Sequence, residues 1–181
     1  SFARSRPGTR GSGRTSAALV ASPSNPTGTL VSTERLSAMA EIARDRGGTL
    51  IVDEIYHGLV YEGEYTTALA FADDAFVINS FSKYFNMTGW RLGWLVAPER
   101  HVRDIEKLAQ NLYISPASPS QRAALACFDP ETLAILESRR QAFEKRRDFL
   151  VPALRELGFR IPVMPTGGFF VYADCSGLTD D

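Results

Sequence analysis

Cysteine and histidine are scarce in this chain, which has two of each among 181 residues. The cysteines, Cys127 and Cys175, lie far apart, with no CxxC motif and no histidine beside either of them. This spacing argues against a disulfide framework and against a metal site, so we expect free thiols, no bound metal and a reducing, cytoplasmic location.

Long apolar runs and an excess of positive charge are also missing. No stretch is apolar for long enough to cross a membrane. The formal net charge is −1, whereas a nucleic-acid surface normally requires a clustered basic excess. What remains is an ordinary composition, 44% hydrophobic and 23% charged, which is typical of a globular protein. A length of 181 residues indicates one domain, or one domain and part of a second.

The two ends of the chain differ from its middle. Residues 1–16 hold four arginines and no acid, and their Gly and Pro residues interrupt any helix, so we expect a flexible linker or loop. The chain starts at Ser1 and stops at Asp181, soon after a strand-like run, which suggests a part of a longer protein. We expect one large-domain unit over 17–130 and a helix leading into a smaller α+β domain over 131–181.

Short apolar runs alternate with helical patterns along the chain. Continuous runs, typical of buried parallel strands, are found at 17–21, 49–53, 75–79 and 92–97, with a last strand expected at 168–173. Helices are expected from Ser32 or Thr33 to about Gly47, over 99–112 and over 120–128. A long charged helix is expected from about Glu131, with leucine or phenylalanine every seven residues at 136, 143, 150 and 157 and a kink at Pro152. This alternation predicts a three-layer α/β/α fold with a mainly parallel sheet.

Polar side chains follow three of the predicted strands. Asn25 lies four residues beyond the first strand, Asp53 ends the second, and Lys83 lies four residues beyond the third. Ligands of open parallel sheets bind at the carboxyl ends of the strands, so we expect these residues to share one edge of the sheet.

Pyridoxal phosphate is the cofactor that this set of residues suits. A lysine can hold its aldehyde as a Schiff base and carry protons, which is the role we assign to Lys83. A carboxylate, here Asp53, keeps the pyridine nitrogen protonated. Tyr56 and Asn25 can hydrogen-bond the ring oxygen. Hydroxyls and a planar guanidinium suit the phosphate, and these come from Ser80, Ser82 and Arg91.

Four motifs occur in the order and approximate spacing seen in fold-type I aminotransferases. They are Asn25-Pro26-Thr27-Gly28, Asp53-Glu54-Ile55-Tyr56, Ser80-Phe81-Ser82-Lys83 and Gly89-Trp90-Arg91. The chain from about residue 17 to 173 therefore resembles the class I/II family of aspartate, alanine and aromatic aminotransferases, and its "PTGGFF" at 165–170 is similar to the turn that enters the family's small domain.

This resemblance implies an enzyme that transfers an amino group between an amino acid and a 2-oxo acid by a ping-pong route, as a homodimer. It also implies the catalytic and cofactor roles given above for Lys83, Asp53 and Tyr56. Members of the family continue beyond this chain at both ends, upstream with a phosphate-binding loop and a stacking aromatic residue, downstream with an arginine for the substrate carboxylate.

Three other functions compete with this interpretation. "SFSK" fits the S-x-x-K motif of serine acyl-enzymes, with Ser80 as nucleophile, but no K-T-G follows. A carbon–sulfur lyase would use the same lysine, and an aminotransferase-like domain can also sense ligands in a transcriptional regulator. His57 and His101 receive no chemical role, and we expect His57 to be a surface ring and Trp90 and Trp94 to serve packing.

Overall fold

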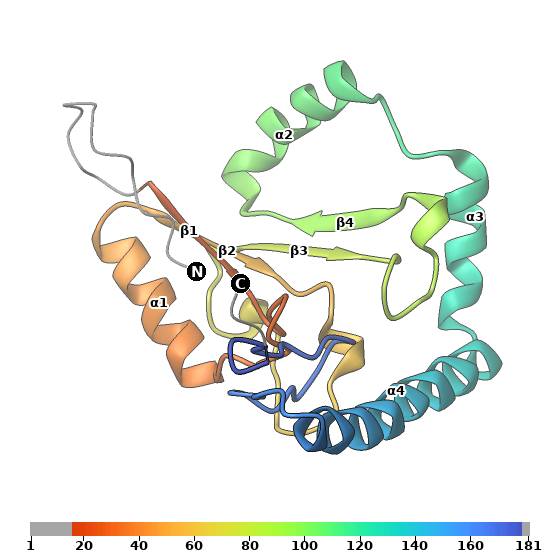
Figure 1. Cartoon of the computed structure of the whole chain (residues 1–181). Coiled ribbons are helices and arrows are strands. Elements are labelled where there is room, and N and C mark those ends of the chain that lie inside the picture. The colour runs from red at the N-terminus through yellow and green to blue at the C-terminus, as the bar shows by residue number, and fades with distance from the viewer. Residues whose placement is uncertain (1–15, 179–181) are drawn as a thin grey trace.

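A four-stranded sheet lies at the centre of the computed structural model, which describes residues 16–178 (Figure 1). Its strands follow the chain order: β1 (Ala17–Ala21), β2 (Thr49–Asp53), β3 (Phe76–Ser80) and β4 (Gly93–Val96). The first three are parallel, and β4 runs antiparallel to β3. The predicted α/β fold with a mainly parallel sheet is confirmed, and each predicted strand boundary in this sheet lies within one residue of the observed one.

One face of the sheet is covered by α1 (Thr33–Asp45), as Figure 1 shows beside β1 and β2. The helix begins where the Ser32 hydroxyl accepts a hydrogen bond from the Arg35 N–H, a preferred N-cap arrangement. Apolar side chains of the strands, the helix and the segment after β2 form the core under this face: Ala40, Leu50, Val52, Ala68, Ala72, Ala75 and Val77. This packing fixes β2 and β3, whose ends hold the predicted site.

The remaining helices are α2 (Glu99–Leu112), α3 (Ser118–Leu125) and α4 (Pro130–Glu156), with short 3-10 turns η1 (His57–Leu59), η2 (Ala68–Ala70), η3 (Thr88–Trp90) and η4 (Ala126–Phe128). A second apolar cluster joins α3 and η4 to the loop after β3 through Phe81, Met87, Ala124 and Cys127. This cluster supports the loop that contains Lys83. No helix among residues 16–178 combines the length and the apolar character needed to span a membrane.

The seven-residue repeat of the long helix α4 does not coincide with one buried face. Its seven-residue repeat starts with a buried Leu136, 2% exposed, and ends at Leu157, which is 68% exposed. A straight helix of 3.6 residues per turn rotates away from a seven-residue repeat, so the repeat does not mark one buried face over this length. Pro152 lies inside the helix and does not end it.

The prediction of a strand at 168–173 is wrong: these residues form no strand, and isolated bridges occur only at their two flanks, Val60 with Gly167 and Arg160 with Asp174. Gly168 adopts a left-handed backbone (φ 75°), which turns the chain out of an extended course. Instead, the Thr166 and Gly167 N–H groups both donate to the Gly28 carbonyl at 2.9 Å. The turn at 165–170 is thereby attached to the loop that follows β1.

Candidate functional site

The carboxyl ends of β1, β2 and β3 meet at one edge of the sheet, as the sequence predicted. Ala21 is in register with Asp53, and the Ser22 N–H donates to the Asp53 carbonyl. On the other side of β2 the Glu54 N–H donates to the Ile78 carbonyl. The loops that contain Asn25, Asp53 and Lys83 therefore leave the sheet from the same edge.

Tyr56 lies in the turn after β2 and is 5% exposed. Burial raises the pKa of its phenol, the Asp53 carboxylate raises that pKa further, and the nearby Asn25 side chain opposes the rise. The phenol thus stays neutral, close enough to Asp53 and Asn25 to respond to both. Asp53 is oriented by the Ile55 N–H, which donates to its Oδ1 at 3.1 Å. Three of the predicted site residues are brought together here.

Lys83 faces this group from the loop after β3. Its Nζ lies 5.9 Å from the centre of the Tyr56 ring and 5.5 Å from that of Phe169. An open cavity of about 230 Å³ is bordered by Lys83 together with Leu59, Ser82, Asn86, Thr88, Phe143 and Phe169. The amino group thus lies beside this pair of aromatic rings, at the edge of a space that can admit a small ligand.

Ser80 and Ser82 form a compact hydroxyl pair between β3 and Lys83. Their Oγ atoms are 2.9 Å apart, and the Ser82 N–H donates to the Ser80 Oγ at 3.0 Å. The Ser80 hydroxyl also lies 3.0 Å from the Leu92 carbonyl of the returning chain. The turn that presents Lys83 is therefore closed by its own hydroxyls.

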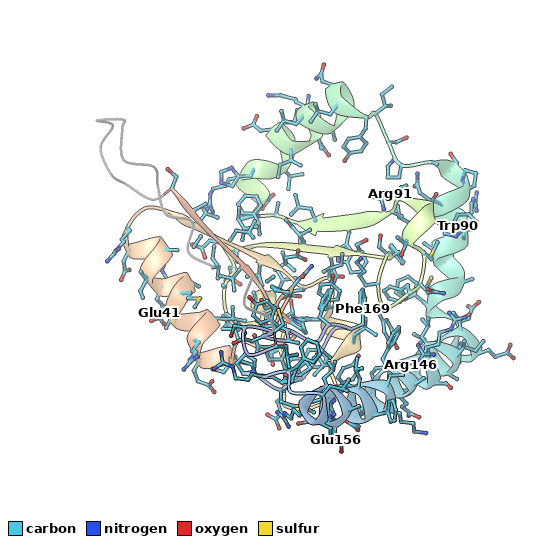
Figure 2. All side chains as sticks on the ribbon, viewed as in Figure 1. Glu41, Trp90, Arg91, Arg146, Glu156 and Phe169 are labelled. Atoms are coloured by element: carbon cyan, nitrogen blue, oxygen red, sulfur yellow. The ribbon has the colours of Figure 1, made fainter. Side chains whose placement is uncertain are left out.

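Arg91 follows η3 and is exposed beside Trp90, as Figure 2 shows. Its backbone is left-handed (φ 52°), and its guanidinium donates to the Thr88 carbonyl at 3.0 Å. Among the described residues it makes no hydrogen bond or ion pair with Ser80 or Ser82. Its phosphate-binding role remains a prediction.

Several residues near the site were not predicted from the sequence. Phe169 lies between the sheet and α4 in Figure 2, packed against Tyr56 with ring centres 5.6 Å apart. A second cavity, of about 200 Å³, shares Phe143 and Phe169 with the first. The only sequence signal for Phe169 was its place in "PTGGFF".

The interpretation of His57 as a surface ring is wrong. Its side chain is only 13% exposed, and its Nδ1 lies 3.3 Å from a carboxylate oxygen of Glu54. Burial lowers the pKa of the imidazole, while the Glu54 carboxylate acts in the opposite direction. The turn after β2 thus contains a buried carboxylate–imidazole pair directly behind Asp53 and Tyr56.

The sequence matches the family model described as "Aminotransferase class I and II" over residues 6–181. A valine–pyruvate aminotransferase of Mycobacterium tuberculosis is 43% identical over 165 residues, which are 90% of this chain and 42% of that protein. An aspartate/prephenate aminotransferase of Thermus thermophilus is 35% identical over 93% of this chain and 44% of its own length.

The fold points to the same group of proteins. The crystal structure of an aminotransferase from Mycobacterium tuberculosis superposes with a TM-score of 0.88 at 42% identity, covering 92% of this chain and 43% of that one. This chain therefore spans less than half the length of the curated relatives it matches. It belongs to the aminotransferase class I and II family.

Proposed function

We propose that the protein containing this chain is a pyridoxal-phosphate-dependent aminotransferase, with Lys83 as its catalytic lysine. The observation that supports this most strongly is the position of the Lys83 amino group, 5.9 Å from the centre of the Tyr56 ring, at the sheet edge that also holds Asp53 and Asn25. A solvated lysine would need neither these neighbours nor a place on the border of a cavity, which Lys83 has.

The donor and acceptor groups at this edge fit pyridoxal phosphate. They comprise a primary amine, a carboxylate, a neutral phenol with an amide, and two hydroxyls with a guanidinium nearby. When bound, the cofactor would supply an electron-accepting pyridine ring and an aldehyde carbon that can accept and return an amino group.

Asp53 and Tyr56 would act on the ring. The Asp53 carboxylate, held by the Ile55 N–H, can keep a proton on a basic ring nitrogen because opposite charges a few ångströms apart stabilise each other. The Tyr56 phenol, whose pKa is raised by burial, remains protonated and can donate to a ring oxygen. The Asn25 side chain, which lies near the same phenol, would also bind that oxygen.

Lys83 would move the proton. A free amine accepts a proton from the α-carbon of the amino-acid substrate and returns it to a neighbouring carbon, which is general acid–base catalysis by one group. The rings of Tyr56 and Phe169, which pack against each other, cover one side of Nζ and limit the water there. Limited water favours transfer of the proton between the two carbons over its loss to solvent.

The phosphate would lie against Ser80, Ser82 and Arg91. The hydroxyls of Ser80 and Ser82 already bond to each other within one turn. The Ser80 hydroxyl also bonds to the carbonyl of Leu92, the residue that follows Arg91 in the chain. The Arg91 guanidinium uses one N–H for Thr88, and the others can bind phosphate oxygens in a forked arrangement.

The substrates proposed are an amino acid and a 2-oxo acid in a ping-pong reaction, in a cytoplasmic homodimer. Two relatives bear the names valine–pyruvate and aspartate/prephenate aminotransferase, which supports this substrate class. We also propose that residues 17–130 belong to the cofactor-binding domain and residues 131–181 to the helix and turn that lead into a smaller domain.

Replacing Lys83 by alanine tests the proposal in the full-length protein. We expect the rate of amino-group transfer to fall by about a thousandfold or more, because no other amine lines the cavity. Far-ultraviolet circular dichroism and the melting temperature should stay close to the wild type, since Lys83 makes no ion pair among the described residues.

Lys107→Ala, on the exposed surface of α2, is the matched control and should retain full activity. A Lys83→Ala protein that transaminates at the wild-type rate would disprove the assignment. Wild-type protein that releases ammonia and pyruvate from a sulfur amino acid, without any need for a 2-oxo acid, would identify a lyase instead.

A further inference from the structure

A buried carboxylate lies next to Asp53 in the chain but on the opposite side of the strand. Glu54 is 3% exposed and no lysine or arginine among the described residues lies within ion-pair distance of it. A carboxylate in such a place must be compensated by hydrogen bonds, because burial without partners is costly. Its partners therefore show what it holds together.

Glu54 contacts two separate parts of the chain. One of its oxygens, Oε1, accepts from the Ala68 N–H at 2.8 Å and from the Thr67 hydroxyl at 3.1 Å. The other, Oε2, lies 3.3 Å from Nδ1 of His57. Burial lowers the pKa of His57, so the contact joins the carboxylate to an imidazole whose neutral form is favoured. The side chain thus joins η1 to the start of η2.

Glu54 also closes the turn that contains Tyr56. The His57 N–H donates to the backbone carbonyl of Glu54 at 2.9 Å, so main chain and side chain both connect residues 54 and 57 across Tyr56. The His57 ring is further held by Tyr65, with ring centres 5.0 Å apart. On the far side Ala68 is fully buried in the core beneath the sheet.

We propose that Glu54 is a positioning residue, whose buried carboxylate anchors the Asp53–His57 turn to the core and so holds Asp53 and Tyr56 in place relative to Lys83. This inference rests on the function proposed above for those three residues. Asp53 and Tyr56 need a rigid support because each must stay in the position from which it can hydrogen-bond a bound cofactor ring.

The test compares Glu54→Ala, Glu54→Gln and the exposed control Glu64→Ala in the full-length protein. In the alanine variant, without cofactor, we expect amide hydrogen exchange at Ile55 and His57 to quicken by about tenfold or more, while Val52 within β2 stays protected. The dissociation constant for pyridoxal phosphate should rise by about tenfold or more, as for loss of a residue that orients another.

Glutamine should rescue both properties to within about threefold of the wild type. Its Oε1 can accept from Thr67 and Ala68, and its N–H can donate to Nδ1 of a neutral His57 whose proton has moved to Nε2. If the alanine variant does not fold, Thr67→Val removes one donor to Glu54 at equal shape, together with the long 3.4 Å bond that the Thr67 hydroxyl accepts from the Leu69 N–H, and should move both readouts in the same direction by less.

Unchanged exchange at Ile55 and His57 in the alanine variant would overturn the proposal. So would a lower melting temperature with unchanged cofactor affinity, or a glutamine variant as impaired as the alanine one. If the wild type itself does not bind pyridoxal phosphate, the proposed function fails, and the exchange measurement still decides whether Glu54 holds the turn.

Discussion

At the scale of one residue, the burial of the His57 ring decides its protonation state. The ring is surrounded by the Glu54 carboxylate, the Tyr65 ring and the turn after β2, with little access to water. Burial lowers its pKa more strongly than the carboxylate raises it. The neutral imidazole is the form that the native structure prefers.

This preference predicts a pH-dependent stability. A histidine with a lowered folded pKa binds a proton more tightly in the unfolded state, so the free energy of unfolding falls as the pH drops from about 6.5 through the lower folded pKa. In His57→Asn this part of the pH dependence should disappear. Urea unfolding between about pH 5 and 8 measures it.

His101→Asn is the matched control, because it removes the other histidine of the chain. It should leave the pH dependence of the wild type intact. Equal pH profiles for His57→Asn and the wild type would show that His57 is not buried in its neutral form.

At the scale of elements, α4 is attached to the site by arginines. The buried Arg147 donates to the Pro165 carbonyl at 2.9 Å, pairs with Glu62 and lies 5.1 Å from the Tyr61 ring centre. Arg140 donates to the Val60 carbonyl at 3.1 Å. These contacts join the helix to the residues after η1 and to the turn at 165–170, which contains Phe169. The position of the Phe169 ring beside Lys83 therefore depends on α4.

Arg147→Met should lower the free energy of unfolding by about 1–3 kcal/mol, the usual cost of leaving a buried carbonyl without its donor. Its carboxylate partners Glu62 and Asp148 are exposed and can return to water, so the loss stays below that for a fully buried ion pair. Urea denaturation gives the value. Arg139→Met, at an exposed position of the same helix, should change stability by less than about 0.5 kcal/mol, and equal losses in both variants would contradict the attachment.

At the scale of the whole molecule, the two faces of the sheet differ. The face opposite the core has Leu19, 62% exposed, and the neighbouring Ile78 and Leu95 in open positions. Helix α2 has no buried residue, and its Leu112 is 76% exposed. Such large apolar surfaces are uncommon on monomeric soluble proteins. The chain also spans only 42–44% of the length of its relatives.

We predict that the 181-residue chain, produced by itself, binds the dye 8-anilinonaphthalene-1-sulfonate severalfold more strongly than the full-length protein. The reason is that further residues of the family fold would cover these apolar side chains. Fluorescence titration at equal molar concentration gives the comparison. Equal dye binding by the two proteins would mean that this surface is open in both.

Much of the site could be predicted from local sequence. Asp53 ends one apolar run and Lys83 follows another, both runs are typical of buried strands, and the parallel direction of those strands brings their ends together. Ser80 and Ser82 bond to each other within one turn, which is also a local effect. The guanidinium direction of Arg91 was not predictable, because Thr88 competes for it.

The sequence by itself determined the four strands of the sheet and the polar residues that end or follow three of them, since these follow from apolar runs and short motifs, whereas the order of the strands in the sheet and the antiparallel direction of β4 came from the structure. Only the tertiary structure decided that Phe169 faces Lys83, that Glu54 is anchored to Thr67 and Ala68, and that residues 165–167 bind the loop after β1. The physical reason is separation along the chain: the Thr166 hydroxyl and the Gly28 carbonyl are 138 residues apart. Contacts of that kind arise from the packing of the sheet, α4 and the turn together, which no local pattern records.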